Sequence, residues 1–214
     1  MAEPLAAIIL AGGASSRMGW DKASLVLDGT KGATLLERTV EAARSAGATQ
    51  IIVVGDRPEP PVSADLHGVL FVRENPPRSG PVPALDTALA EVHAARVLVL
   101  PCDLAHPWEA CRELVNTMGP RGPVSGSGAD KADGVVAVDA GGHRQHLTAL
   151  FRTEALRRTT APGTTRVRDR VAGLVLIDVP EPIDRPGIWE DMDTPGDVER
   201  IRSDSGATDR STHR

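Results

Sequence analysis

The chain has 214 residues, of which 41% are hydrophobic and 25% charged; this is the composition of a soluble globular protein and excludes disordered and fibrous classes. The net charge of -5 and the 2% aromatic content argue against a nucleic acid as the main partner, because such proteins need cationic surfaces and stacking side chains. A small, highly charged ligand remains compatible, since it needs only a local group of donors and cations.

The chain shows no sign of an oxidising compartment or of a membrane. Two cysteines, Cys102 and Cys111, lack CxxC spacing, so we expect reduced, buried thiols. The apolar stretch over residues 5–11 is too short to span a bilayer, and Glu3 precedes it where a signal peptide needs Lys or Arg. We therefore expect a cytoplasmic protein without a membrane partner.

Short runs rich in Val, Ile and Leu alternate with segments of helical period, a pattern that predicts an α/β fold with a mainly parallel sheet. We expect strands over Leu5–Ala11, Gln50–Val54, Val69–Val72, Arg96–Leu100, Gly134–Val138 and Leu174–Val179. We expect helices over Thr34–Ala46, Val82–Ala94, Trp108–Met118, Thr165–Ala172 and Thr194–Arg202. Gly47 is placed to end the first helix, and Thr194 and Asp197 to cap the last one.

The first strand leads into LAGGASSRMGWDK, residues 10–22, where backbone N–H groups of a glycine-rich turn can converge on phosphate oxygens. Gly12 and Gly13 permit close approach, and Arg17 and Lys22 supply the positive charge that a triphosphate requires. The spacing fits neither a P-loop nor a dinucleotide-binding GxGxxG. A simple tight turn would explain the glycines, but not the Arg and Lys beyond them.

This segment resembles the LAGGxSxRMGxDK signature of the molybdenum cofactor guanylyltransferases, a family of Rossmann-like nucleotidyltransferases, and the resemblance continues in order along most of residues 5–202. It implies that GMP is transferred from GTP to molybdopterin, usually as its molybdenum complex, with release of pyrophosphate. It also implies that the backbone of Leu10, Ala11, Gly12 and Gly13 holds the nucleotide, while Arg17 and Lys22 hold its phosphates.

Two acidic segments are candidates for a magnesium site. Asp103 follows the fourth strand in VLVLPCDLAHP, at the edge where open parallel sheets bind ligands, and the resemblance implies that it binds nucleotide and Mg²⁺. The alternative, a helix cap, is disfavoured because the next helix starts several residues later. WEDMDTPGD resembles a family segment with asparagines at the places of Asp191 and Asp193. Asp191 is the second metal candidate; the alternative is that it is an acid in an exposed loop. Asp193 is a weaker candidate for binding the acceptor.

The remaining signals concern the base and the acceptor. Asn75, rather than Glu74, stands by spacing where the family usually has an Asp near the nucleotide. Pro83 stands inside the segment that matches the family's Gly-Pro-Leu-Ala-Gly, and it removes one N–H there. Residues 144–152 resemble the family strand that faces the pterin, so His146 is a candidate contact for the acceptor phosphate; a packing or surface role is the alternative.

We therefore expect a single three-layer α/β/α Rossmann-like nucleotidyltransferase domain over residues 1–202 and a disordered tail over 203–214. Mg²⁺ is the expected cofactor, and GTP and molybdopterin the substrates. Transient contact with proteins that deliver molybdopterin or mature molybdoenzymes is compatible with this assignment. The alternatives are a related enzyme that uses CTP or another acceptor, such as a sugar phosphate, and a non-catalytic nucleotide sensor.

Overall fold

The apolar runs of the sequence form one central sheet. The computed structural model describes residues 3–12, 22–26, 32–57, 66–119, 132–159, 163–192, 194 and 196–201. In this part of the chain the sheet has seven strands in the order β3-β2-β1-β4-β6-β5-β7. The strands are β1 (Leu5–Leu10), β2 (Ala48–Val54), β3 (Leu70–Val72), β4 (Arg96–Pro101), β5 (Gly134–Val138), β6 (Arg144–Arg152) and β7 (Leu176–Pro180).

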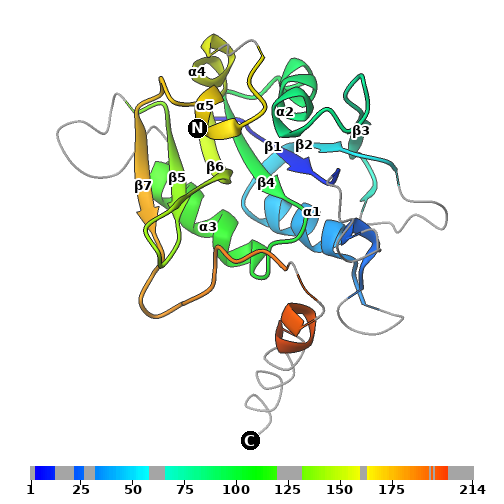
Figure 1. Cartoon of the computed structure of the whole chain (residues 1–214), viewed down its shortest axis with the longest axis vertical. Coiled ribbons are helices and arrows are strands. Elements are labelled where there is room, and N and C mark those ends of the chain that lie inside the picture. Colours follow the sequence, from blue (N-terminus) through cyan, green and yellow to red (C-terminus); the bar gives the residue numbers. More distant parts are fainter. Residues whose placement is uncertain are drawn as a thin grey trace, which may run out of the picture.

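Helices cover both faces of the sheet, which confirms the predicted three-layer architecture (Figure 1). One face carries α1 (Leu35–Ser45) and α3 (Pro107–Met118). The other face carries α2 (Pro81–Ala90), α4 (Thr153–Arg158) and α5 (Val167–Arg170). A short 3₁₀ turn, η1 (Lys22–Ser24), lies beside α1, and a further helix covers 196–201.

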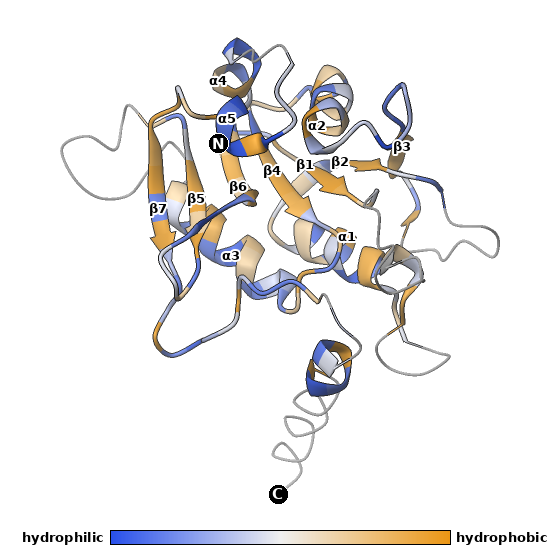
Figure 2. Cartoon of the chain, viewed as in Figure 1, coloured by the Kyte–Doolittle hydropathy of each residue, from blue (hydrophilic) through white to orange (hydrophobic). Residues whose placement is uncertain are grey.

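The strands are buried from both sides, and their side chains alternate between two core clusters. In β1, Ala7 and Ile9 pack with α1 and α3, whereas Ala6 and Ile8 pack with α2. Figure 2 shows the strands of the sheet as mostly hydrophobic ribbons, with helices of mixed hydropathy beside them. The near-continuous apolar runs of the sequence are therefore explained by strands with two covered faces.

The predicted caps at Gly47 and at Thr194 with Asp197 are confirmed, and a further cap lies at the start of α1. Thr34 and Glu37 form a reciprocal capping box at the start of α1, with N–O distances of 2.7 and 3.2 Å. Gly47 follows this helix with φ +95°, a conformation that favours glycine. Thr194 and Asp197 exchange the same pair of bonds, at 2.8 and 3.2 Å, before the helix at 196–201.

Four elements differ from the expectations. Helix α2 ends at Ala90 rather than Ala94. The reason is that side chains bind the backbone carbonyls after it: the Arg157 guanidinium donates a hydrogen bond to the Val92 carbonyl (2.6 Å), and the Gln50 amide donates one to the Glu91 carbonyl (2.7 Å). Helix α5 has only four residues. The apolar pattern missed α4, which is one short helix, and β6, whose first half is polar.

Strand β6 is antiparallel to both its neighbours, β4 and β5, while the other paired strands run parallel. Its first residue, Arg144, therefore lies at the edge where β1, β4, β5 and β7 end. The turn over 139–143, which joins β5 to β6, reaches the same edge. This edge is the one where ligands of open α/β sheets bind.

Both cysteines are buried and neither forms a disulfide, as expected for reduced thiols. Burial raises the pKa of the Cys111 thiol to about 12, so this thiol is inert at neutral pH.

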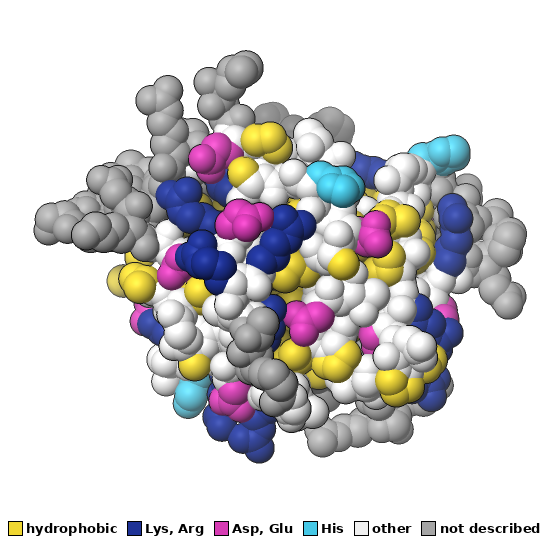
Figure 3. All heavy atoms as spheres, turned by 90° about the horizontal axis from the view of Figure 1, so that it is seen from above, with side chains coloured by type: hydrophobic (Ala, Val, Ile, Leu, Met, Phe, Trp, Pro, Cys, Tyr) yellow, Lys and Arg dark blue, Asp and Glu magenta, His cyan; other side chains and the backbone are white. Residues whose placement is uncertain are grey.

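The outer face formed by α2, α4 and α5 has basic and acidic side chains side by side (Figure 3). Arg157 pairs with Glu154, Arg168 with Asp169, and Arg170 with Asp86. None of the described helices is long and apolar enough to cross a membrane.

We expect Gly134→Ala to lower the free energy of unfolding by about 1–3 kcal/mol, because a Cβ there would lie 2.6 Å from the Leu150 carbonyl oxygen, inside a packed sheet. Gly173→Ala is the matched control, since its Cβ would meet nothing within 4 Å. Urea unfolding followed by circular dichroism measures both changes. Equal midpoints for the two variants would contradict this account of the β5–β6 packing.

Candidate nucleotide and metal site

The backbone beyond β1 is held firmly between two neighbouring strands. The Ala11 N–H donates to the Val54 carbonyl of β2 (2.9 Å), and the Leu10 carbonyl accepts from the Cys102 N–H after β4 (3.2 Å). Gly12 follows at the exposed edge of the sheet. Gly55 packs so closely that a Cβ there would lie 3.2 Å from the Ala11 Cβ. The expected nucleotide-binding backbone thus leaves the sheet at a fixed place.

The rest of the expected phosphate site is only partly described. Gly13 and Arg17 lie outside the described residues, and so does the side chain of Lys22. The backbone of Lys22 opens η1, whose Ala23 is buried in the core cluster of α1 and α3. This burial fixes the start of η1 on the α1 side of the sheet.

The two acids predicted to hold a metal come from distant parts of the chain, and the backbone brings their segments together. Leu104 and Asp191 form an isolated antiparallel bridge. The Asp103 carbonyl accepts from the Met192 N–H (2.9 Å), and the Ala105 N–H donates to the Glu190 carbonyl (2.9 Å). Asp103 is half-buried and Asp191 is exposed. Asp193, the weaker candidate, lies outside the described residues.

This donor set fits Mg²⁺. The ion typically takes one or two carboxylates and completes its shell with phosphate oxygens and water, so two acids beside the expected phosphate site would be sufficient. Among the described residues, no three His, Cys, Asp or Glu side chains group closely enough to hold a metal by themselves. A cation here would therefore depend on oxygens of the bound nucleotide.

The loop between β3 and α2 carries the candidate Asn75, which is exposed. Glu74 is 8% exposed, and its carboxylate accepts the Arg78 N–H (2.7 Å), so this side chain organises the loop itself. Helix α2 then starts with Pro81, and Pro83 follows. Since proline has no N–H, only Val82 of the first three helical residues keeps a donor, which makes this helix end a poor phosphate cradle.

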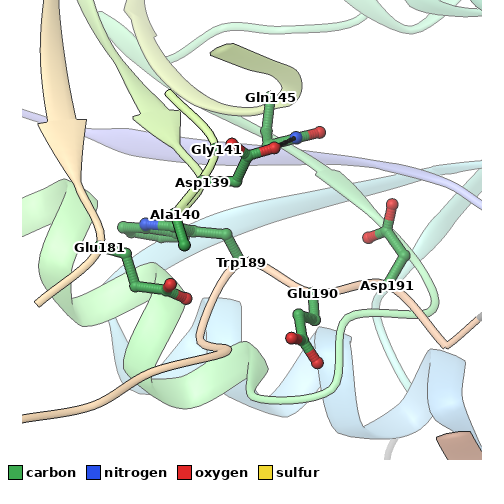
Figure 4. Close-up of a pocket in the computed structure, with 8 residues that line it drawn as sticks. All are labelled: Asp139, Ala140, Gly141, Gln145, Glu181, Trp189, Glu190 and Asp191. Carbon is green, nitrogen blue, oxygen red and sulfur yellow. Dashed lines mark hydrogen bonds between the residues drawn. The ribbon is translucent and has the colours of Figure 1, made fainter. Parts of the chain in front are cut away.

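A pocket of about 420 Å³ opens beside Asp191 (Figure 4). One wall is formed by Asp139, in the turn between β5 and β6, and by Gln145 at the start of β6. The other is the segment after β7, with Glu181, Trp189 and Glu190. None of these five residues was predicted to belong to the site. The available signal was the pair Asp139 and Gln145 around a Gly-Gly turn between two adjacent strands.

Within the pocket, Asp139 is an organised hydrogen-bond acceptor. One carboxylate oxygen accepts the His143 N–H (2.9 Å) and the other accepts the Gln145 side-chain amide (2.7 Å). The bond from the His143 backbone is the main cause that lowers the pKa of Asp139 below its usual value, so this carboxyl stays ionised at neutral pH.

His146 lies on β6 but not in the lining of this pocket. Partial burial, followed by the positive charges of Arg144 and Arg168, lowers the pKa of this imidazole below its usual 6.5. A neutral imidazole donates one hydrogen bond but contributes no charge toward a phosphate. This weakens the acceptor role expected for His146 without excluding a hydrogen bond.

Comparison with known proteins agrees with this architecture. A family model described as MobA-like NTP transferase domain matches residues 7–172. A molybdenum cofactor guanylyltransferase from Xanthomonas euvesicatoria is 38% identical over 102 residues, 47% of this chain and 48% of that protein. The matched part of the chain thus spans about half the length of this curated relative. A probable molybdenum cofactor guanylyltransferase from Mycobacterium tuberculosis is 31% identical over 157 residues, 72% of this chain and 71% of that protein.

Solved structures share the fold at lower identity. A nucleotidyl transferase from Methanothermobacter has a TM-score of 0.70 at 22% identity and covers 96% of this chain and 99% of its own. A Mycobacterium tuberculosis protein in complex with manganese has a TM-score of 0.58 at 20% identity and covers 95% of this chain and 100% of its own.

We expect Gly55→Ala to weaken the binding of a nucleoside triphosphate about tenfold, because the new methyl would press on Ala11, where the cradle leaves β1. Gly68→Ala is the control, since Gly68 also has a positive φ but an added Cβ would meet nothing within 4 Å. Calorimetric titration with GTP and Mg²⁺ measures the affinity. Equal losses in both variants would point to backbone strain rather than to crowding of the cradle.

We expect the His146 imidazole to titrate below pH 6.5 and Arg168→Gln to move its midpoint upward, because this substitution removes one of the positive charges that disfavour protonation. NMR titration measures the midpoint, with the His146 signal assigned by its loss in His146→Gln. A midpoint at or above 6.5 in the parent protein would contradict the described environment.

Proposed function

Since the chain belongs to the MobA-like NTP transferase family, we propose that it transfers GMP from GTP to molybdopterin, or to its molybdenum complex, and releases pyrophosphate. The observation that carries this proposal is the meeting of the Asp103 and Asp191 segments at the sheet edge that also holds the Leu10–Gly12 backbone. A nucleotide-binding turn and two carboxylates at one edge are what metal-assisted phosphoryl chemistry requires.

In the proposed reaction, an oxygen of the acceptor's terminal phosphate attacks the α-phosphorus of GTP in line with the leaving group. The new P–O bond forms as the bond to the bridging oxygen of the β-phosphate breaks, and both bonding electrons leave with pyrophosphate. No general base is needed, because a phosphate monoester is already ionised near neutral pH.

Each residue of the site has a distinct part in this reaction. The backbone of Leu10–Gly13 positions the nucleotide, and Arg17 and Lys22 balance the charge that builds up on the departing pyrophosphate. Asp103 and Asp191 would hold Mg²⁺, which, when bound, neutralises the triphosphate and orients it. Asn75 offers an amide to the ribose or base. We assign all of these roles to one domain over residues 1–202, followed by a tail over 203–214 that lies outside the described residues.

The choice of guanine as the base is proposed from two sequence features. The loop over residues 10–22 begins with Ala-Gly-Gly and ends with Asp-Lys. This supports guanine, because the related cytidylyltransferases usually have Ala-Ala-Gly and Pro-Lys at these two places. Pro83 removes one backbone donor from α2, so any contact of this helix with the base must use Val82 or side chains.

We expect Asp103→Ala to keep the fold and to lower the rate of pyrophosphate release at least about 100-fold, because a ligand of the catalytic cation and its charge are lost. Asp178→Asn, an exposed acid of β7, is the control and is expected to keep the parental rate. The assay combines GTP, Mg²⁺ and molybdopterin, and far-UV circular dichroism checks the fold. Parental turnover in Asp103→Ala would show the metal assignment to be wrong.

A thermal-shift panel with GTP, CTP, ATP and UTP in the presence of Mg²⁺ tests the base, because a ligand that binds only the folded state raises its stability. We expect GTP to give the largest shift. A larger shift with CTP would assign the protein to the cytidylyl branch, and a shift without turnover on molybdopterin would make it a sensor.

A further inference from the structure

We propose that Thr39, a buried residue of α1, positions the Asp103 carboxylate for the metal by fixing the backbone directly before it. This inference rests on the proposed function and deepens it, since Asp103 is the first metal candidate of that site. Thr39 acts through the backbone of another segment, so it is a positioning residue and not a ligand. The sequence analysis did not single it out.

Thr39 places a polar group in the buried part of α1. Its side chain is 0% exposed, like those of Val40 and Ala43, which belong to the apolar core cluster under this helix. A buried hydroxyl without a partner costs free energy, so its hydrogen bonds decide what the residue does. The Thr39 hydroxyl lies 3.0 Å from the Leu35 carbonyl oxygen and 3.2 Å from the Cys102 carbonyl oxygen, and it can donate to either.

The two carbonyls differ in what the hydroxyl adds to them. Leu35 is the first residue of α1, and in an α-helix its carbonyl already accepts the N–H four residues further on. The Cys102 carbonyl lies beyond β4 and is separated from Thr39 by 63 positions in the sequence. The bond to Cys102 is therefore the one that joins α1 to the segment with Asp103.

The two peptide groups on either side of the Asp103 Cα are both held in place. The group before it contains the Cys102 carbonyl, which accepts from the Thr39 hydroxyl. The group after it contains the Asp103 carbonyl, which accepts from the Met192 N–H (2.9 Å). Because peptide groups are planar, holding both planes holds φ and ψ of Asp103 and with them the direction of its Cα–Cβ bond. Thr39 thus supplies one of the two restraints that aim this carboxylate.

The preceding residue of α1 binds the same segment at a second point. The Arg38 guanidinium donates to the Ala105 carbonyl (3.4 Å) and lies over the Trp108 ring, 5.0 Å from the ring centroid. Ala105 is 1% exposed, so this bond reaches into the packed interior. The chain over residues 102–105 is therefore attached to α1 at both ends, with Asp103 between the two attachments.

The test measures how tightly the full chain binds the Mn²⁺ complex of GTP, by water proton relaxation, a readout that needs no turnover. We expect Thr39→Val to weaken this binding about fivefold, because a hydrogen bond that orients a metal ligand is lost. Thr39→Ser keeps the hydroxyl and should restore the parental affinity. Thr153→Val is the matched control and should bind like the parent, since the equally buried Thr153 hydroxyl donates to the Ala94 carbonyl (2.7 Å) before the opposite end of β4.

A double mutant shows whether Thr39 acts through Asp103. Asp103→Asn keeps an oxygen ligand but loses its charge, so binding of the Mn²⁺ complex is weakened. In this background Thr39→Val should change the affinity by less than about twofold, because the carboxylate that it orients is already gone. If circular dichroism shows that Thr39→Val does not fold, Thr39→Ala is read in the same way, since it also lacks the hydroxyl and alanine favours a helix.

The outcomes separate this inference from the proposed function. Parental affinity in Thr39→Val, an equal loss in Thr153→Val, no recovery in Thr39→Ser, or an undiminished effect in the Asp103→Asn background would overturn the inference. So would a parent protein that does not bind the Mn²⁺ complex. If Thr39→Val weakens binding through Asp103 but the parent transfers no nucleotide to molybdopterin, the proposed function fails while the positioning role stands. Transfer by the parent, with Thr39→Val and Thr153→Val binding alike, has the reverse meaning.

Discussion

The site depends on the backbone hydrogen bonds that join residues 103–105 to residues 190–192. They bring an acid from the C-terminal part of the chain to the end of the central strand β4, where Asp103 already lies. Each such bond contributes only about 1 kcal/mol, so the segment also needs packing. A small apolar cluster provides it, in which Met192 and Val198 pack with Leu35 of α1 and with Ala105. The geometry of the candidate metal site is thus secured by a hydrophobic contact on its outer side.

The two halves of the sheet present different chemical groups at its carboxyl edge. Strands β1, β2 and β3 run parallel and present backbone and a loop amide, which are suited to a nucleotide. The half with β5, β6 and β7 presents carboxylates, an amide and an indole, which line the pocket beside Asp191. The backbone segments of Asp103 and Asp191 meet at the end of β4, at the boundary between these two halves.

The strands and main helices could be predicted from the sequence, because near-continuous runs such as β1 and capping signals such as Thr34 and Gly47 act locally. Loops with a chemical signature, such as the turn after β1 and the Asp103 segment, were found from their residues at the ends of predicted strands, and their resemblance to a family added the expected roles. The pocket was not found, because Asp139 and Trp189 meet only through the tertiary fold and neither has a distinctive neighbourhood in the sequence. The end of α2 was misjudged for a similar reason: the side chains of Arg157 and Gln50, which donate to the carbonyls of the two residues after the helix, come from other elements.

The reversed direction of β6 also bears on how such a protein can diversify. A parallel connection must cross the sheet and needs a dozen or more residues, whereas β5 and β6 are joined by the five residues 139–143. Hairpin turns accept insertions and deletions without any change in strand order. Lengthening or shortening this turn would remodel one wall of the pocket beside Asp191 and leave the edge formed by β1, β2 and β3 unchanged, so the two halves of the sheet edge can vary independently in evolution.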